Sequence, residues 1–137
     1  MGAWGHNTFD NDDACDFVYD MEKVDDLSPV ERAFTRIERE AEFPYLASEE
    51  MALAACEVLA RLKGNPGYHN AYTEDVDAWV AAHPIEPPTP LVERGLAIIE
   101  RVLHGESDLR ARWEEVEDAE PWIAAVKDLQ ARLTTST

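Results

Sequence analysis

The fold is decided near the middle of the chain by the stretch SEEMALAACEVLARLKG, residues 48–64. Ser48 is suited to cap the start of a helix, and Gly64 is suited to end it. Between them, apolar residues cover well over half of a helical wheel: Met51, Ala52, Ala55, Cys56, Val58, Leu59 and Leu62. A helix that is apolar over so much of its surface needs other helices to cover it, so we expect it at the centre of the fold.

Helical periodicity continues on both sides of this segment. Asn11 is a suitable N-cap for a first helix, and Ser28-Pro29-Val30-Glu31 has the form of a capping box with proline at the first helical position. No stretch alternates with the period of two that is typical of strands. Further helix starts are expected at Thr73, Thr89, Ser107 and Asp118. The sequence therefore predicts one all-α domain over residues 1–137, a bundle of about six or seven helices.

The charge limits the classes of partner. The chain has 29 Asp and Glu against 12 Lys and Arg, a formal net charge of −17. Such a field repels nucleic-acid phosphates and anionic membranes and attracts a basic protein surface. No apolar run approaches the roughly 20 residues of a membrane span. We therefore expect a possible basic protein partner, no binding to nucleic acid or membrane, and no indication of oligomeric state.

The cysteines and the N-terminus bear on the compartment. Cys15 and Cys56 stand among apolar residues and form no Cys-x-x-Cys pattern, which favours two buried free thiols. No lysine or arginine precedes Lys23, so the basic region of a secretory signal is missing. We expect a cytoplasmic protein.

The first residues are too irregular for helix periodicity alone, and they carry a family resemblance. The residues that carry the resemblance are Met1-Gly2-Ala3-Trp4-Gly5, followed by Phe9-Asp10-Asn11-Asp12. This opening resembles the N-terminal signature of a bacterial family known as domain of unknown function 4259. Weaker similarity covers Ala54-Ala55-Cys56-Glu57 and the group Ser107, Leu109 and Trp113. The resemblance implies a bacterial origin and brings no activity with it.

Four residues of this motif are predicted to be structural: Gly2, Trp4, Gly5 and Phe9. Small residues beside a tryptophan let the backbone pass close to a helix while the indole fills a gap in the core. We interpret the segment as an arm packed into the bundle with Trp4 buried. The alternative is a ligand-binding role.

A candidate binding cluster near the N-terminus consists of His6, Asp10, Asp12 and Asp13. Closely spaced oxygen ligands suit a hard cation such as Ca²⁺ or Mg²⁺, but the glycine and the glutamate of an EF-hand loop are missing from this spacing. The favoured interpretation is a capped helix with an acidic first turn. The sequence accordingly predicts no metal and no cofactor.

Glu57 interrupts the central apolar helix and is a candidate for a buried carboxylate in acid–base work. Glu50, Glu57 and Arg61 fall within one narrow arc of the helical wheel, and Glu57 can pair with Arg61 four residues later. We therefore favour a polar stripe opposite the apolar face.

Two functions remain open. The first is a non-catalytic interaction module that engages a basic partner, as antitoxins and immunity proteins neutralise basic nucleases. It rests on the charge, since residues 1–30 hold eight acids and only Lys23, and on the lack of a recognisable catalytic motif. The second is a metal-dependent or acid–base enzyme built around His6, Asp10, Asp12 and Glu57. The two differ in whether those side chains meet in one pocket.

Overall fold

The computed structural model describes residues 5–40, 45–115 and 119–135, and in these residues the chain forms seven helices and no strand. The prediction of an all-α bundle of six or seven helices is confirmed. None of these helices has the length and apolar character needed to cross a membrane. The helices are α1 (Asp12–Glu22), α2 (Ser28–Arg39), α3 (Leu46–Leu62), α4 (Glu74–Ala82), α5 (Thr89–His104), α6 (Asp108–Glu114) and α7 (Ala119–Thr134).

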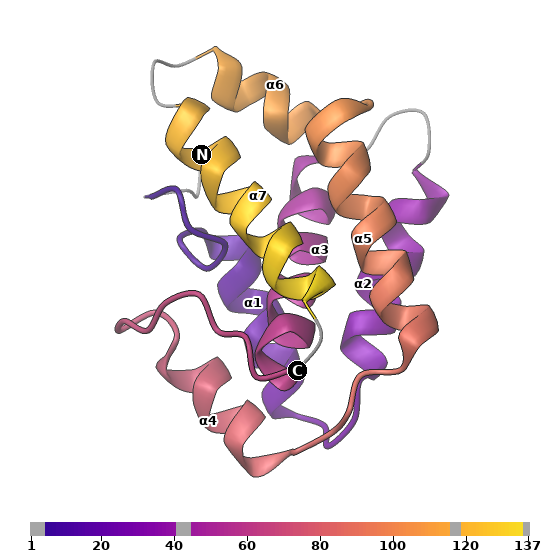
Figure 1. Cartoon of the computed structure of the whole chain (residues 1–137), viewed down its shortest axis with the longest axis vertical. Coiled ribbons are helices and arrows are strands. Elements are labelled where there is room, and N and C mark those ends of the chain that lie inside the picture. Colours follow the sequence, from indigo (N-terminus) through magenta and orange to yellow (C-terminus); the bar gives the residue numbers. More distant parts are fainter. Residues whose placement is uncertain (1–4, 41–44, 116–118, 136–137) are drawn as a thin grey trace.

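The central helix is α3, as the sequence predicts, and it contacts each of the other six described helices (Figure 1). The helices α3 and α5 can approach each other closely because the contact is formed by small residues, buried alanines on α3 and Gly95 on α5. A Cβ atom at Gly95 would lie 3.1 Å from Cys56 Sγ and 3.2 Å from Phe34 Cζ. Gly95 therefore allows α5 to cross α3 and α2 at short range.

Enclosure of α3 also buries its polar side chains, which corrects the prediction of a polar stripe. Glu50, Glu57 and Arg61 are only 6%, 0% and 4% exposed. The helical wheel placed them opposite the apolar face, but other helices reach them there: Glu50 bonds to Asp13 of α1, Arg61 to Asp77 of α4 and Glu57 to Arg132 of α7. The predicted ion pair between Glu57 and Arg61 is present, with 3.4 Å between Oε1 and Nε.

Two of the predicted helix caps are present. Asn11 Oδ1 accepts the backbone N–H of Ala14 at 2.7 Å at the start of α1. Ser107 Oγ accepts the backbone N–H of Arg110 at 3.0 Å at the start of α6. Each bond satisfies a backbone donor that the first turn of a helix leaves without an internal partner.

Three other capping predictions are wrong, because the side chains bond elsewhere. The helix α3 begins at Leu46, upstream of Ser48, whose hydroxyl donates to Glu40 at 2.9 Å. At the start of α2, the Ser28 hydroxyl donates to Asp26 at 2.6 Å and forms no helix cap. Thr73 precedes α4 but its hydroxyl donates to Asp77 at 2.9 Å.

The two cysteines differ in exposure. Cys56 is buried and its thiol donates to the Gly95 carbonyl at 3.6 Å, whereas Cys15 is exposed, which corrects the prediction of two buried thiols. Cys15 falls beside the buried stripe of α1, which is formed by Ala14, Phe17, Val18 and Met21. Gly2, Trp4 and Asp118 lie outside the described residues, so the burial of Trp4 stays a prediction.

Candidate functional site

The N-terminal segment, residues 5–11, folds into a tight turn before α1. The backbone N–H of Asp10 donates to the Asn7 carbonyl at 3.0 Å, and the Asp10 carboxylate accepts the Asn7 N–H at 3.2 Å. A Cβ atom at Gly5 would collide with this carboxylate. The turn thus explains both the small residue at position 5 and the near burial of Asp10, which is 8% exposed.

Phe9 and Thr8 attach this segment to the rest of the bundle. Phe9 is fully buried, and its backbone N–H donates to the Tyr68 hydroxyl at 3.2 Å. The Arg61 guanidinium lies over the Phe9 ring, 5.7 Å from its centroid. The Thr8 hydroxyl donates to Glu57 Oε2 at 3.4 Å. The segment therefore packs directly against α3.

Glu57 is held by two arginines. Arg132 of α7 donates from Nη1 and Nη2 to the two carboxylate oxygens at 2.6 and 2.9 Å, and Arg61 lies on the other side. Arg61 also binds the Asp77 carboxylate and donates to the Tyr68 carbonyl at 2.7 Å. A bidentate arginine contact of this kind is short and directional, and with the Arg61–Asp77 pair it joins α3, α4 and α7. This arrangement is suited to structural support.

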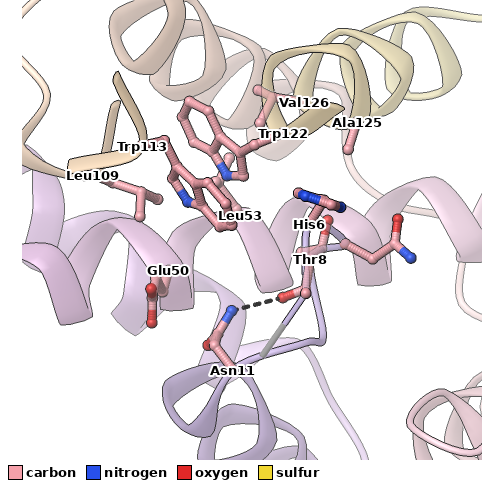
Figure 2. A pocket seen from close by; sticks show the side chains of 12 residues that line it. His6, Thr8, Asn11, Glu50, Leu53, Leu109, Trp113, Trp122, Ala125 and Val126 are labelled. Carbon is pink, nitrogen blue, oxygen red and sulfur yellow. Dashed lines mark hydrogen bonds between the residues drawn. The ribbon is translucent and has the colours of Figure 1, made fainter. Parts of the chain in front are cut away.

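A small pocket lies at the other end of the segment (Figure 2). Its free volume is about 20 Å³, enough for a single water-sized group. Aromatic rings form one wall: the Trp113 and Trp122 indoles stack with 6.1 Å between centroids, and His6 lies 5.5 Å from Trp113. The lining residues are Gly5, His6, Asn7, Thr8, Asn11, Glu50, Leu53, Leu109, Trp113, Trp122, Ala125 and Val126.

Glu50 is the acidic residue of this pocket. Burial raises its pKa to about 8, and a hydrogen bond with Asp13 and the charges of Asp12, Asp13 and Glu49 act in the same direction. No Lys, Arg or His forms an ion pair with Glu50 in the described part of the chain. Glu50 is therefore a nearly buried acid with acidic neighbours.

Glu49, the preceding residue, has hydrogen-bond partners at the start of α6. Its carboxylate accepts the backbone N–H groups of Asp108 and Leu109 at 2.9 and 3.1 Å, and it also accepts the Ser107 hydroxyl. Burial raises the pKa of Glu49, while these hydrogen bonds oppose that rise. Glu49 thereby satisfies the open backbone donors at the start of α6 and anchors that helix on α3.

The structure separates the residues of the predicted cluster. His6 lines the pocket, whereas Asp10, Asp12, Asp13 and Glu57 do not. Among them, Asp13 bonds to Glu50 beside the pocket, and Asp12 is exposed in the first turn of α1. Within residues 5–40, 45–115 and 119–135, no group of three or more His, Cys, Asp or Glu is placed to hold a metal ion.

A comparison with known families gives one match, over residues 2–125, to the family described as Domain of unknown function (DUF4259). The chain belongs to the DUF4259 family. No curated protein and no solved structure shows a significant match. The matched region includes the whole N-terminal segment and α6, while Arg132 lies beyond it.

The segments that carry the DUF4259 resemblance meet on α3. Phe9 and its neighbours pack at Glu57, and Ser107 and Leu109 bind Glu49. Trp113 forms the aromatic wall of the pocket near Glu50. Segments that are distant in the sequence of this DUF4259 member are thus close together around one helix.

The sequence reasoning did not select Glu50, Trp113 or Trp122 as site residues. The helical wheel assigns Glu50 to a polar stripe opposite the apolar face, and the two tryptophans fit the apolar stripes of their helices. A signal for the glutamates exists in the adjacent pair Glu49-Glu50, which precedes thirteen residues that include only one other acid, Glu57. Only the packing of α6 and α7 reveals the aromatic wall.

Proposed function

We propose that this protein is a non-catalytic binding module whose acidic face docks on a basic surface of a partner protein, in the manner of an immunity or antitoxin protein. The acidic face is defined by exposed side chains on two adjacent helices, α1 and α4. Its members are Asp12, Asp16, Asp20, Glu74 and Asp75.

The observation that carries this proposal is charge segregation. The sequences of α1 and α4 contain eight acids and no lysine or arginine. Electrostatic effects on the exposed Cys15 thiol show how closely the acids gather: burial raises its pKa, and Asp12, Asp16, Asp10 and Asp75 raise it further. Close like charges attract a basic surface and increase the rate of association. Asp20, at one end of the face, also pairs with the exposed Lys23 at 3.7 Å.

The opposite side of the bundle shows that this segregation is local. On α2 and α5, Arg94 donates to the Glu38 carboxylate at 2.7 Å, and Arg101 donates to the carbonyls of Ile37 and Glu40. Acids in that region lie among arginines. The helices α1 and α4 differ from α2 and α5 because their own sequences hold no lysine or arginine.

Two exposed tyrosines flank the acidic face and suit a protein interface. Tyr19 of α1 is 67% exposed, and Tyr72, just before α4, is 51% exposed. Tyrosine is enriched at interfaces because it offers a large contact area together with a hydroxyl group.

The test compares two variants that each remove three negative charges. One changes the acidic face, Asp16→Asn, Glu74→Gln and Asp75→Asn, and the control changes three exposed acids elsewhere, Glu93→Gln, Glu106→Gln and Glu120→Gln. Decalysine serves as the basic probe, and calorimetry gives its Kd. We expect the acidic-face variant to bind about tenfold more weakly than the control. Equal weakening in both variants would mean that only the net charge matters and would overturn the proposal.

A further inference from the structure

The pocket of Figure 2 adjoins one end of the acidic face. Asn11, which lines the pocket, is the N-cap of α1, and the acidic face begins at the next residue, Asp12. Asp12 also acts electrostatically on Glu50. A basic surface lying along α1 would therefore bring its side chains to the pocket.

Glu50 distinguishes this pocket from the other buried acids of α3. Glu57 is bound by Arg132 and Arg61, and Glu49 is bound by backbone N–H groups. Glu50 is 94% buried, since its exposed fraction is 6%, and it has no cationic partner in the described residues. A carboxylate in such surroundings costs free energy unless a positive group approaches it.

The pocket wall suits an ammonium group in particular. A cation is attracted to the face of an aromatic ring, most strongly to tryptophan. In this wall Trp113 lies beside His6 and stacks on Trp122. The Thr8 carbonyl is already engaged, because Asn11 Nδ2 donates to it at 3.2 Å, so this side of the pocket is rigidly shaped. The free volume of about 20 Å³ is enough for a primary ammonium, which is about the size of a water molecule, and it favours that group over a bulkier cation.

We propose that this pocket receives the primary ammonium of a lysine side chain from the basic partner, held between the Glu50 carboxylate and the aromatic wall. The proposal rests on the proposed function for the source of the lysine. It adds a specific anchoring point to an interface that would otherwise depend on diffuse charge.

Proton exchange accompanies this binding. The carboxyl of Glu50 shares a hydrogen bond with Asp13, and Asp12, Glu49 and His6 are the other titratable groups at the site. An incoming ammonium favours the ionised carboxylate, so binding releases a proton from the Glu50–Asp13 pair. The affinity for an ammonium therefore increases as the pH rises from about 6 to about 9.

The test uses n-butylammonium chloride as the lysine side-chain probe and tetramethylammonium chloride at equal concentration as the size control. The indole N–H resonances of Trp113 and Trp122 report binding in NMR titrations. We expect saturable shifts with n-butylammonium alone, increasing with pH. In Glu50→Gln the affinity should fall by about tenfold or more, and in the matched exposed variant Glu106→Gln it should be unchanged.

Equal affinity in Glu50→Gln, no saturable shift, or equal binding of tetramethylammonium would overturn the inference. The decalysine experiment keeps the two proposals separate. If decalysine depends on the acidic face while n-butylammonium leaves the indoles unshifted, only this inference fails. If n-butylammonium binds at Glu50 while both triple-charge variants bind decalysine equally, the proposed docking face fails and the ammonium pocket stands.

Discussion

Glu57 and Glu50 are seven residues apart on α3, both are buried, and their surroundings are opposite. Glu57 receives two hydrogen bonds from Arg132 and lies next to Arg61. Glu50 lies next to Asp13 and lines a small aromatic pocket. The same residue type on one helix thus forms a structural ion pair at one end and an unbalanced acid at the other.

The comparison shows that burial alone does not define a functional carboxylate. A buried charge that has its partners stabilises the fold. A buried acid without a cation raises the free energy of the folded state when it ionises, and a cationic ligand can lower that free energy. Glu57, the sequence-based candidate for acid–base chemistry, is bound by Arg132 and Arg61. Burial raises the pKa of Glu50, which the sequence did not single out.

Loss of the ion pair between Arg132 and Glu57 should have the largest effect on stability. Arg132→Met leaves a fully buried carboxylate with Arg61 as its remaining cation, and we expect the free energy of unfolding to fall by about 3–5 kcal/mol. Urea denaturation provides the measurement. Arg112→Met, which removes an exposed pair with Asp108, is the control and should cost less than about 0.5 kcal/mol. A similar decrease in the free energy of unfolding in both variants would show that the Arg132–Glu57 pair contributes no more than a surface pair.

Neutralisation of Glu50 should stabilise the protein at high pH. Its pKa is raised from 4.5 to about 8, so between these values the folded state holds a proton that the unfolded state has lost. This contribution to stability is complete below about pH 4.5 and is lost as the pH rises through about 8. Glu50→Gln cannot titrate, and at about pH 9 we expect it to be more stable than the parent by roughly 1–3 kcal/mol.

Unfolding curves recorded between about pH 5 and pH 9 measure this difference. Glu106→Gln, on an exposed side chain, should follow the parent at every pH. Parallel curves for Glu50→Gln and the parent would mean that Glu50 is ionised in the folded protein without cost, and the contrast with Glu57 would disappear.

Divalent cations should have the smallest effect. Asp10 bonds within its own turn and Asp12 is exposed, so we expect Ca²⁺ and Mg²⁺ to leave the melting temperature nearly unchanged. A specific site would add about 2.7 kcal/mol at a hundredfold excess over its dissociation constant. A rise that Asp10→Ala abolishes and Asp25→Ala retains would contradict this expectation, and it would favour the metal-dependent alternative.

Much of the fold could be predicted because its signals are local. The apolar stripe of α1 and the caps at Asn11 and Ser107 follow from residues within one or two turns of each other. Ser48 and Thr73 do not cap their helices because their hydroxyl groups donate to carboxylates instead. Ser48 donates to Glu40, and Thr73 donates to Asp77. Competition of this kind depends on neighbours that a local pattern does not include.

The sequence by itself determined the helical class, the central position of α3 and the acidity of α1 and α4, because periodicity and charge are properties of short segments. The tertiary structure decided the roles of the three glutamates of α3. Arg132 reaches Glu57 from 75 positions away, and Glu49 meets the start of α6 nearly 60 positions later. Glu50 meets Asp13 and lines one pocket with Trp113 and Trp122 only because α1, α6 and α7 pack around one helix. The pKa of a carboxyl depends on such neighbours in space, and for these side chains helical periodicity predicted the wrong environment.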